Sequence, residues 1–194
     1  MLTKQRMAEP DLTLPGPETV LLEDGMQAII RPIRPEDAYY LQAGFLRLSE
    51  QSIYFRFLTH KKELTDEEAL EFARVDYTTR MAFVATCEEG GEQVVVGVAR
   101  YVQLPEAPEI AEAAVIVGDD YQGRGIGWHL MNHLVAYARL QGLRYLRGVI
   151  NVENSLMVNY IQRSGYAFEQ HFKDGAWEIT VAVGGKPAAD EDGG

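Results

Sequence analysis

The sequence holds a single cysteine in 194 residues, Cys87, so no internal disulfide can form. Cys87 lies in the apolar stretch MAFVATC, which predicts a small core side chain, because a nucleophilic role would need a partner base. Long apolar runs are absent too, since stretches such as residues 94–98 end well short of the roughly 18 to 20 residues that cross a bilayer. With 46% hydrophobic content, the chain fits one soluble domain of ordinary size, and we expect no membrane partner.

Basic side chains are scarce: 18 lysines and arginines stand against 29 acids, for a net charge of −11. Such a charge opposes the phosphate neutralisation that gives nucleic-acid binders most of their affinity, and no basic stripe offsets it. We therefore expect no nucleic-acid partner and a weak preference for basic partners. The first residues lack the apolar centre of a secretory signal and hold too many acids and prolines for a transit peptide, so we expect a cytoplasmic protein.

Neither end of the chain shows a sustained periodicity of apolar residues. Residues 1–24 are rich in proline, glycine and acids, and residues 184–194 form a low-complexity acidic stretch. We predict a flexible N-terminal segment over 1–24, one domain over 25–183, and a disordered acidic tail over 184–194.

Alternating and β-branched stretches predict strands, whereas 3.6-residue periodicity with capping signals predicts helices. Thr65 and Glu68 form a capping box, and the stretches EEGGE and DG (residues 174–175) predict hairpin loops. Strands are predicted at residues 26–33, 81–87, 94–104, 109–117, 145–150, 166–173 and 176–183. Helices are predicted at residues 35–48, 66–76, 126–141 and 154–164, with a short helix or turn at 49–58. Strands that cluster early and alternate with helices later predict a mixed sheet in an α/β layered domain.

Three glycines stand close together where a predicted strand gives way to a helix, in VIVGDDYQGRGIGWHL. A strand that runs through glycines into a helix start builds an anion site, because first-turn N–H groups lack partners and the helix dipole is positive there. No lysine follows the glycines, which excludes the phosphate loop of nucleotide triphosphatases. GRGIG also fits the dinucleotide fingerprint poorly, since the preceding strand belongs to a hairpin-connected group.

The spacing of Gln122, Gly125 and Gly127 is Q-x-x-G-x-G, and here the chain resembles the GNAT acyltransferase superfamily. A second stretch, NVENSLMVNYIQRSGY, is similar to another superfamily motif, with an asparagine at a helix start and a tyrosine six residues on. The order of predicted elements matches the superfamily over residues 27–183. The resemblance implies an α/β (α+β) GNAT fold, with a mixed, mostly antiparallel central sheet flanked by helices.

The resemblance also implies acetyl-CoA as the acyl donor, with no metal. Backbone groups of Val115, Ile116 and Val117 would pair with the pantetheine arm like an added strand, and Asn154 would hydrogen-bond the same arm. Arg124 would add positive charge. The residues whose backbone N–H groups would bind the pyrophosphate are Gln122, Gly123, Arg124, Gly125, Ile126 and Gly127.

Acetyl transfer to an amine needs a base for the amine, whose pKa is near 10.4 for lysine, and an acid for the departing thiolate. Glu112 stands in an otherwise apolar strand, where partial burial would raise its pKa, and it matches the superfamily's base. The alternative is a solvent-facing carboxylate. Tyr160 matches the tyrosine placed near the thioester sulfur, with a packed helix aromatic as the alternative. An N–H of the segment 115–117 would stabilise the thioester oxyanion.

Two further pairs carry weaker signals. His129 and His133 share one helix face, but Leu130 stands where a zinc motif needs glutamate, so surface or packing roles are favoured. Asp119 and Asp120 precede a predicted helix and favour its N-terminal dipole over a direct catalytic role.

The first half of the chain indicates the identity of the acyl acceptor. RPIRPEDA, LSEQSIYFRF and DYTTRMAFVA resemble the GNAT domain of bacterial protein lysine acetyltransferases, which modify acyl-CoA synthetases. The two dozen preceding residues are too few for a regulatory domain, so we expect such regulation to be absent or supplied by another chain. Tyr54 and Arg56 are candidates for the acceptor site, with aromatic packing and a structural ion pair as equal alternatives.

The leading hypothesis is therefore an acetyl-CoA-dependent protein lysine N-acetyltransferase acting by direct attack in a ternary complex. The alternatives are an acetyltransferase for small amines such as polyamines, aminoglycosides or amino acids, and a non-catalytic acyl-CoA-binding module. The acidic composition suits a lysine-bearing protein and a small cationic amine equally. The sequence leaves the oligomeric state open, and a homo-oligomer is compatible with it.

Overall fold

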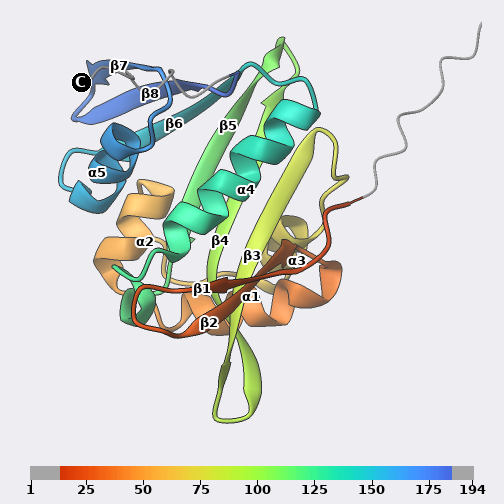
Figure 1. The fold of residues 1–194 in the computed structure, drawn as a ribbon. Coiled ribbons are helices and arrows are strands. Elements are labelled where there is room, and N and C mark those ends of the chain that lie inside the picture. Colours follow the sequence, from red (N-terminus) through yellow and green to blue (C-terminus); the bar gives the residue numbers. More distant parts are fainter. Residues whose placement is uncertain (1–13, 185–194) are drawn as a thin grey trace, which may run out of the picture.

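A computed structural model of the chain describes residues 14–184, in which one mixed sheet carries helices on both faces (Figure 1). The strands are β1 (Glu18–Leu21), β2 (Gln27–Pro32), β3 (Arg80–Glu89), β4 (Glu92–Leu104), β5 (Ala107–Val117), β6 (Tyr145–Asn151), β7 (Phe168–Lys173) and β8 (Ala176–Ala182). The helices are α1 (Ala38–Phe45), α2 (Glu50–Phe57), α3 (Asp66–Ala73), α4 (Ile126–Leu140) and α5 (Ser155–Arg163), with short 3-10 turns at Pro35–Asp37 and Asp119–Tyr121.

The eight strands follow the order β1-β2-β3-β4-β5-β6-β8-β7, and neighbours are antiparallel except β5 and β6, which run parallel. A parallel pair needs a crossover connection, and α4 provides it. In Figure 1, α4 lies across one face of the sheet while α1 and α3 lie behind the other. The predicted mixed, mostly antiparallel sheet flanked by helices is confirmed.

Local signals in the sequence set most of these elements. Thr65 Oγ1 accepts a hydrogen bond from the N–H of Glu68 at 3.2 Å, and Glu68 accepts one from the N–H of Thr65 at 3.0 Å, so the predicted capping box opens α3. The turn between β3 and β4 holds Gly90 and Gly91, both with positive φ, as a tight hairpin favours.

The first strand departs from the prediction. Glu18–Leu21 forms β1 and pairs with β2, whereas the sequence predicted no strand there and a flexible segment over residues 1–24. Asp24 Oδ1 accepts from the N–H of Met26 at 3.0 Å, and Gly25 has a φ of +85°, so Asp-Gly forms a hairpin turn between two apolar stretches. The prolines and glycines nearby made this hairpin turn hard to recognise in the sequence. Residues 1–13 and 185–194 lie outside the described residues.

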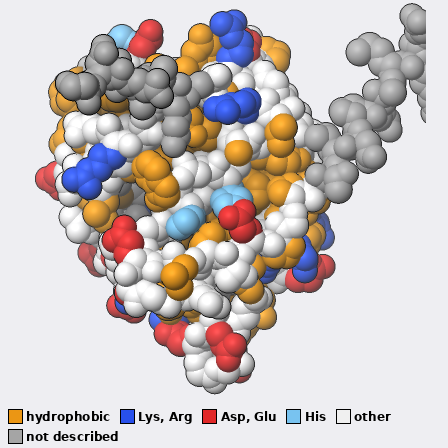
Figure 2. All heavy atoms as spheres, in the orientation of Figure 1, with side chains coloured by type: hydrophobic (Ala, Val, Ile, Leu, Met, Phe, Trp, Pro, Cys, Tyr) orange, Lys and Arg blue, Asp and Glu red, His pale blue; other side chains and the backbone are white. Residues whose placement is uncertain are grey.

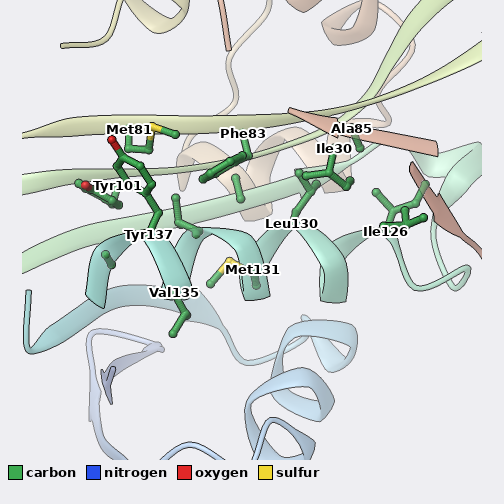
Figure 3. Close-up of a cluster of buried hydrophobic side chains, with 14 of the residues drawn as sticks. Ile30, Met81, Phe83, Ala85, Tyr101, Ile126, Leu130, Met131, Val135 and Tyr137 are labelled. Carbon is green, nitrogen blue, oxygen red and sulfur yellow. The ribbon is translucent and has the colours of Figure 1, made fainter. Parts of the chain in front are cut away.

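The main core lies between α4 and the sheet (Figure 3). Leu130 and Tyr137 of α4 face Met81 and Phe83 of β3, and all four are nearly inaccessible to solvent. Gly97 in β4 lets the helix approach, since a Cβ there would lie 2.9 Å from Leu130 Cδ1. The position of the start of α4, and of the glycine loop before it, therefore depends on close packing against β4.

A buried ion pair anchors the opposite face. Arg31 binds Asp37 through two hydrogen bonds of 2.7 Å, and Asp37 also accepts the N–H of Arg34 at 2.7 Å. The two side chains are 9% and 3% exposed. Removal of one partner from such a pair costs about 3–5 kcal/mol, because the other charge stays buried.

Cys87 is buried in the main core, as predicted, and burial raises its pKa. Among residues 14–184, no helix has the length and apolar character needed to cross a membrane. The face in Figure 2 carries acidic and basic side chains scattered among apolar ones.

Candidate functional site

β5 and β6 separate part-way along their length. Their last register pair is Glu112 opposite Arg147, and beyond it the strands diverge. Gly148 stands at this point, where a Cβ would lie 3.2 Å from the carbonyl oxygen of Ala113. Residues 115–117 pair with β4 on one edge, while no strand within the described residues pairs with their other edge. That edge offers backbone donors and acceptors to an extended ligand.

A cleft of about 530 Å³ opens beside this free edge, between β5, the glycine loop, α5 and α2. It gathers groups from four parts of the chain that are distant in sequence. The predicted site residues that line it are Val115, Ile116, Val117, Gln122, Gly123, Gly125, Ile126, Gly127, Asn154 and Tyr160.

The glycine loop presents the start of α4 to this cleft. Gly123 has a φ of +72°, and Gly125, the N-cap residue of α4, has a φ of +90° and no side-chain cap. The N–H groups of Ile126 and Gly127, at the start of α4, can therefore serve an anion. Gln122 Nε2 donates to the carbonyl of Val117 at 3.1 Å and to Ser52 Oγ at 3.2 Å, which fixes the loop to β5 and α2.

Arg124 is the exception among the predicted donor-site residues, because its side chain does not line the cleft. Its guanidinium binds Asp24 at 2.8 Å and donates to the carbonyl of Asp120 at 2.7 Å. The charge that we expected to face the ligand is thus paired with the β1–β2 turn.

Tyr160 lines the cleft and carries an unsatisfied hydroxyl. The oxygen is buried and has no hydrogen-bond partner among the described residues, and its ring packs edge-on against Trp128 at 5.4 Å. Burial, and to a lesser extent the nearby Tyr166, raises the pKa of Tyr160 above its ordinary value. The phenol therefore stays protonated and can donate a hydrogen bond to a ligand atom.

Asn154 has a structural task as well as a place in the cleft. Its Oδ1 accepts from the N–H of Met157 at 3.1 Å and caps α5. The amide therefore has a fixed orientation, and its Nδ2 group is the one that can donate to a ligand.

Glu112 lines an adjoining cavity of about 240 Å³. Its side chain is 62% exposed, and Oε1 accepts a hydrogen bond from Arg147 Nη2 at 3.0 Å. The expected partial burial of Glu112 is therefore wrong. Alternation along β5 turns its side chain away from α4, whereas Ala111 and Ala113 pack into the main core.

Arg56 of α2 lines both the long cleft and the cavity of Glu112. No carboxylate within residues 14–184 forms an ion pair with it, so the structural ion pair considered for Arg56 is not present in the described part of the chain. Tyr54 instead stacks on His60, with ring centres 5.2 Å apart. Sequence reasoning missed Arg100, which also lines the cavity, although a lone charge in the apolar stretch VVVGVARYV was a signal.

Asp119 connects the end of β5 to α2. It accepts from the N–H and hydroxyl of Ser49, at 2.9 and 2.7 Å, and from the hydroxyl of Ser52 at 2.8 Å. Burial alone would raise the pKa of Asp119, but these hydrogen bonds lower it. Ser49 is the N-cap of α2, so Asp119 also supports the start of α2.

The histidine pair on α4 is engaged within the fold. His133 Nδ1 lies 2.8 Å from the carbonyl oxygen of His129, and Nε2 lies 3.1 Å from a carboxylate oxygen of Glu18. Within residues 14–184, no cluster of three or more histidine, cysteine or acidic side chains is arranged to hold a metal.

The sequence matches a known family. The model of the Acetyltransferase (GNAT) family matches residues 46–166. The chain is 39% identical over 136 residues to Acetyltransferase PA5475 of Pseudomonas aeruginosa, across 70% of this chain and 73% of that protein. It is 32% identical over 165 residues to Acetyltransferase Pat of Mycolicibacterium smegmatis, across 84% of this chain and 47% of that protein. The chain thus spans about half the length of Pat.

Solved structures agree with these matches. The GNAT domain of S. lividans PAT is 28% identical with a TM-score of 0.77, over 86% of this chain and 96% of that one. A cAMP-binding acyltransferase from Mycobacterium smegmatis is 28% identical with a TM-score of 0.59, over 91% of this chain and 51% of that one. The predicted resemblance to GNAT domains of bacterial protein lysine acetyltransferases is confirmed.

Proposed function

Because this chain belongs to the GNAT family of acetyltransferases, we propose that it transfers the acetyl group of acetyl-CoA to the side-chain amine of a protein lysine. The transfer takes place by direct attack in a ternary complex. One observation carries the proposal: Tyr160 lies in the long cleft, Glu112 lies in the adjoining cavity, and Arg56 lines both.

Acetyl-CoA is the donor substrate of this family, and the cleft suits its parts. The pyrophosphate binds the N–H groups of the loop over residues 122–127, where Gly123 and Gly125 keep the backbone free of side chains. The pantetheine arm pairs with the free edge of residues 115–117 and accepts a hydrogen bond from Asn154. Arg124 has a supporting role, since it holds the loop to Asp24.

The chemical step forms a C–N bond and breaks a C–S bond. Glu112 accepts a proton from the amine, which must be neutral to attack, either directly or through a water at the exposed carboxylate. An N–H of residues 115–117 stabilises the oxyanion, and Tyr160 donates to the departing thiolate. The products are an N-acetyl amine and CoA thiol.

The protein-lysine part of the proposal is supported by the likeness to Acetyltransferase Pat, which extends over 84% of this chain. It is also supported by the three N-terminal stretches that resemble the same group.

The test is release of free thiol from acetyl-CoA by the purified protein. Acceptors are acyl-CoA synthetases on one side, and polyamines, aminoglycosides and free amino acids on the other. Acetylation of a synthetase lysine, located by mass spectrometry, is the expected result. Turnover on small amines alone would overturn the protein acceptor, and no acetylation of any amine would overturn the proposed transferase.

A further inference from the structure

Two arginines in the cavity beside Glu112 have no counter-ion among the described residues. Arg56 and Arg100 both line this cavity, and neither donates a hydrogen bond to, or forms an ion pair with, any residue in 14–184. Glu71 is the acid that interacts electrostatically with Arg100. However, its carboxylate forms an ion pair with Arg80, at 3.9 Å. Each guanidinium carries five N–H donors in a planar fork that matches a carboxylate.

Aromatic rings hold these two cations in place. The guanidinium carbon of Arg56 lies 4.9 Å from the centre of the Phe57 ring, and that of Arg100 lies 4.6 Å from the centre of the Phe72 ring. The two rings are stacked on each other, with centres 6.4 Å apart. A ring face attracts a cation but accepts none of its strong hydrogen bonds, so both forks are positioned and still unsatisfied.

Burial makes the positive charges of Arg56 and Arg100 energetically costly unless an anion binds to them. Burial, and then the charge of Arg100, lowers the pKa of Arg56 to about 10, and burial likewise lowers the pKa of Arg100. Both remain charged at neutral pH, because a guanidinium group keeps its proton in proteins. Desolvated cations of this kind gain most from an anion that enters between them.

The balance of charge in the cavity is opposite to that of the chain. Its lining holds the guanidinium groups of Arg56, Arg100 and Arg147 against the single carboxylate of Glu112, which Arg147 already binds. The chain as a whole carries −11. A positive cavity in an acidic protein does not suit a purely cationic acceptor such as a polyamine.

The donor does not account for this charge. Arg100 lines the cavity of Glu112 but not the long cleft. The pyrophosphate is proposed to lie at the glycine loop, and the pantetheine and thioester that approach Glu112 carry no charge. An anion at the arginine pair is therefore expected to belong to the acceptor.

We infer that the acceptor carries a carboxylate close to the amine that is acetylated, and that Arg56 and Arg100 bind this carboxylate. The inference rests on the acetyl transfer from acetyl-CoA to an amine that the proposed function includes. The carboxylate has two possible sources with the same chemistry: an acidic side chain beside a protein lysine, or the carboxylate of a free amino acid. In both cases it orients the amine toward Glu112 and the thioester.

Matched acceptors test this inference with the wild-type protein alone. One pair is a blocked lysine peptide with flanking glutamates and the same peptide with glutamines; the other is free lysine and lysinamide. Within a pair the acceptors differ in carboxylate and not in overall shape. We expect kcat/KM to be at least about tenfold higher for the carboxylate member of one pair. Only that member can form a hydrogen bond between two charged groups with the arginines. The pair that shows this preference identifies the source.

Variants assign the preference to the two arginines. In Arg56→Gln and in Arg100→Gln, the ratio of kcat/KM between carboxylate and amide acceptors should fall toward one. Arg144→Gln, an exposed arginine that lines neither the cleft nor the cavity, is the control and should keep the wild-type ratio.

Equal use of both members of each pair by wild type would overturn the inference while leaving the acetyltransferase intact. Weaker acetyl-CoA binding in Arg56→Gln with an unchanged acceptor ratio would also overturn it, because the arginine would then serve the donor. No acetylation of any amine by wild type would overturn the proposed function, and this inference with it.

Discussion

Glu112 and Arg147 face each other across the parallel strands β5 and β6, with Oε1 and Nη2 3.0 Å apart. They form the last register pair before the strands separate. The ion pair is exposed and adds little to stability. The pair matters for its position, since it holds a carboxylate in the cavity that adjoins the proposed donor cleft.

Removal of the carboxylate charge should affect turnover and not donor binding. Glu112→Gln keeps the shape of the side chain but cannot accept a proton, so we expect kcat to fall roughly 100- to 10,000-fold. Calorimetry should give nearly unchanged affinity for acetyl-CoA. The matched control is Glu109→Gln, an exposed glutamate on the same strand. A Glu112→Gln rate equal to that of the control would remove Glu112 as the base.

Tyr160→Phe removes one oxygen from the donor cleft. The hydroxyl has no partner among the described residues, so its loss should not lower the free energy of unfolding measured in urea. We expect kcat to fall about 10- to 100-fold, because the thiolate loses its hydrogen-bond donor. A variant that is less stable but equally active would show Tyr160 to be a packing residue.

Gly125→Ala tests the anion site at the start of α4. A Cβ at φ +90° is strained by about 1–2 kcal/mol, so the substitution distorts the loop whose backbone N–H groups are proposed to bind the pyrophosphate. We expect the Kd for acetyl-CoA to rise at least about tenfold by calorimetry.

Gly90→Ala is the control for that strain, because Gly90 also has positive φ but lies in the β3–β4 turn. Both variants should lose similar stability, and only Gly125→Ala should lose affinity. Equal affinities in the two variants would place the pyrophosphate elsewhere.

Asp76 should make stability depend on pH. Burial alone would raise its pKa, but hydrogen bonds from the Thr79 hydroxyl and from the N–H groups of Arg80 and Thr78 lower it to about 2. The folded pKa lies below the ordinary 3.8, so this stabilisation is complete above 3.8 and is lost as the pH falls toward 2.

The measurement compares urea unfolding of wild type and Asp76→Asn from neutral pH to about pH 3. The difference in free energy of unfolding should shrink by roughly 1 kcal/mol, a discounted figure because Asp76 is exposed. A difference that stays constant with pH would show that the carboxylate is not stabilised by folding.

Elements with strong local signals could be predicted from the sequence. The Thr65 and Glu68 capping box, the double-glycine hairpin and the glycine-rich start of α4 all lie where their residues indicate. β1 was missed because the Asp24–Gly25 turn lies among prolines and glycines that suggest an irregular segment. The composition of residues 1–24, taken as an average, does not reveal a hairpin turn that depends on two residues alone.

The site was predicted less completely, for a reason that concerns distance along the chain. Arg124 pairs with Asp24, 100 residues away, and no local pattern shows that an acid will take its charge. Arg56 and Arg100 meet at one cavity because α2 packs against β5, which is the neighbour of β4 in the sheet. Motifs indicate the proposed donor site because the residues of each motif are neighbours in sequence, whereas the proposed acceptor site is assembled by packing.

The central claim is direct transfer from acetyl-CoA to an amine in a ternary complex, and initial-rate kinetics with both substrates varied test it most directly. The account predicts double-reciprocal lines that intersect, with CoA thiol and N-acetyl amine formed in equal amounts. Parallel lines, with a labelled acetyl group retained on the protein after CoA leaves, would contradict it.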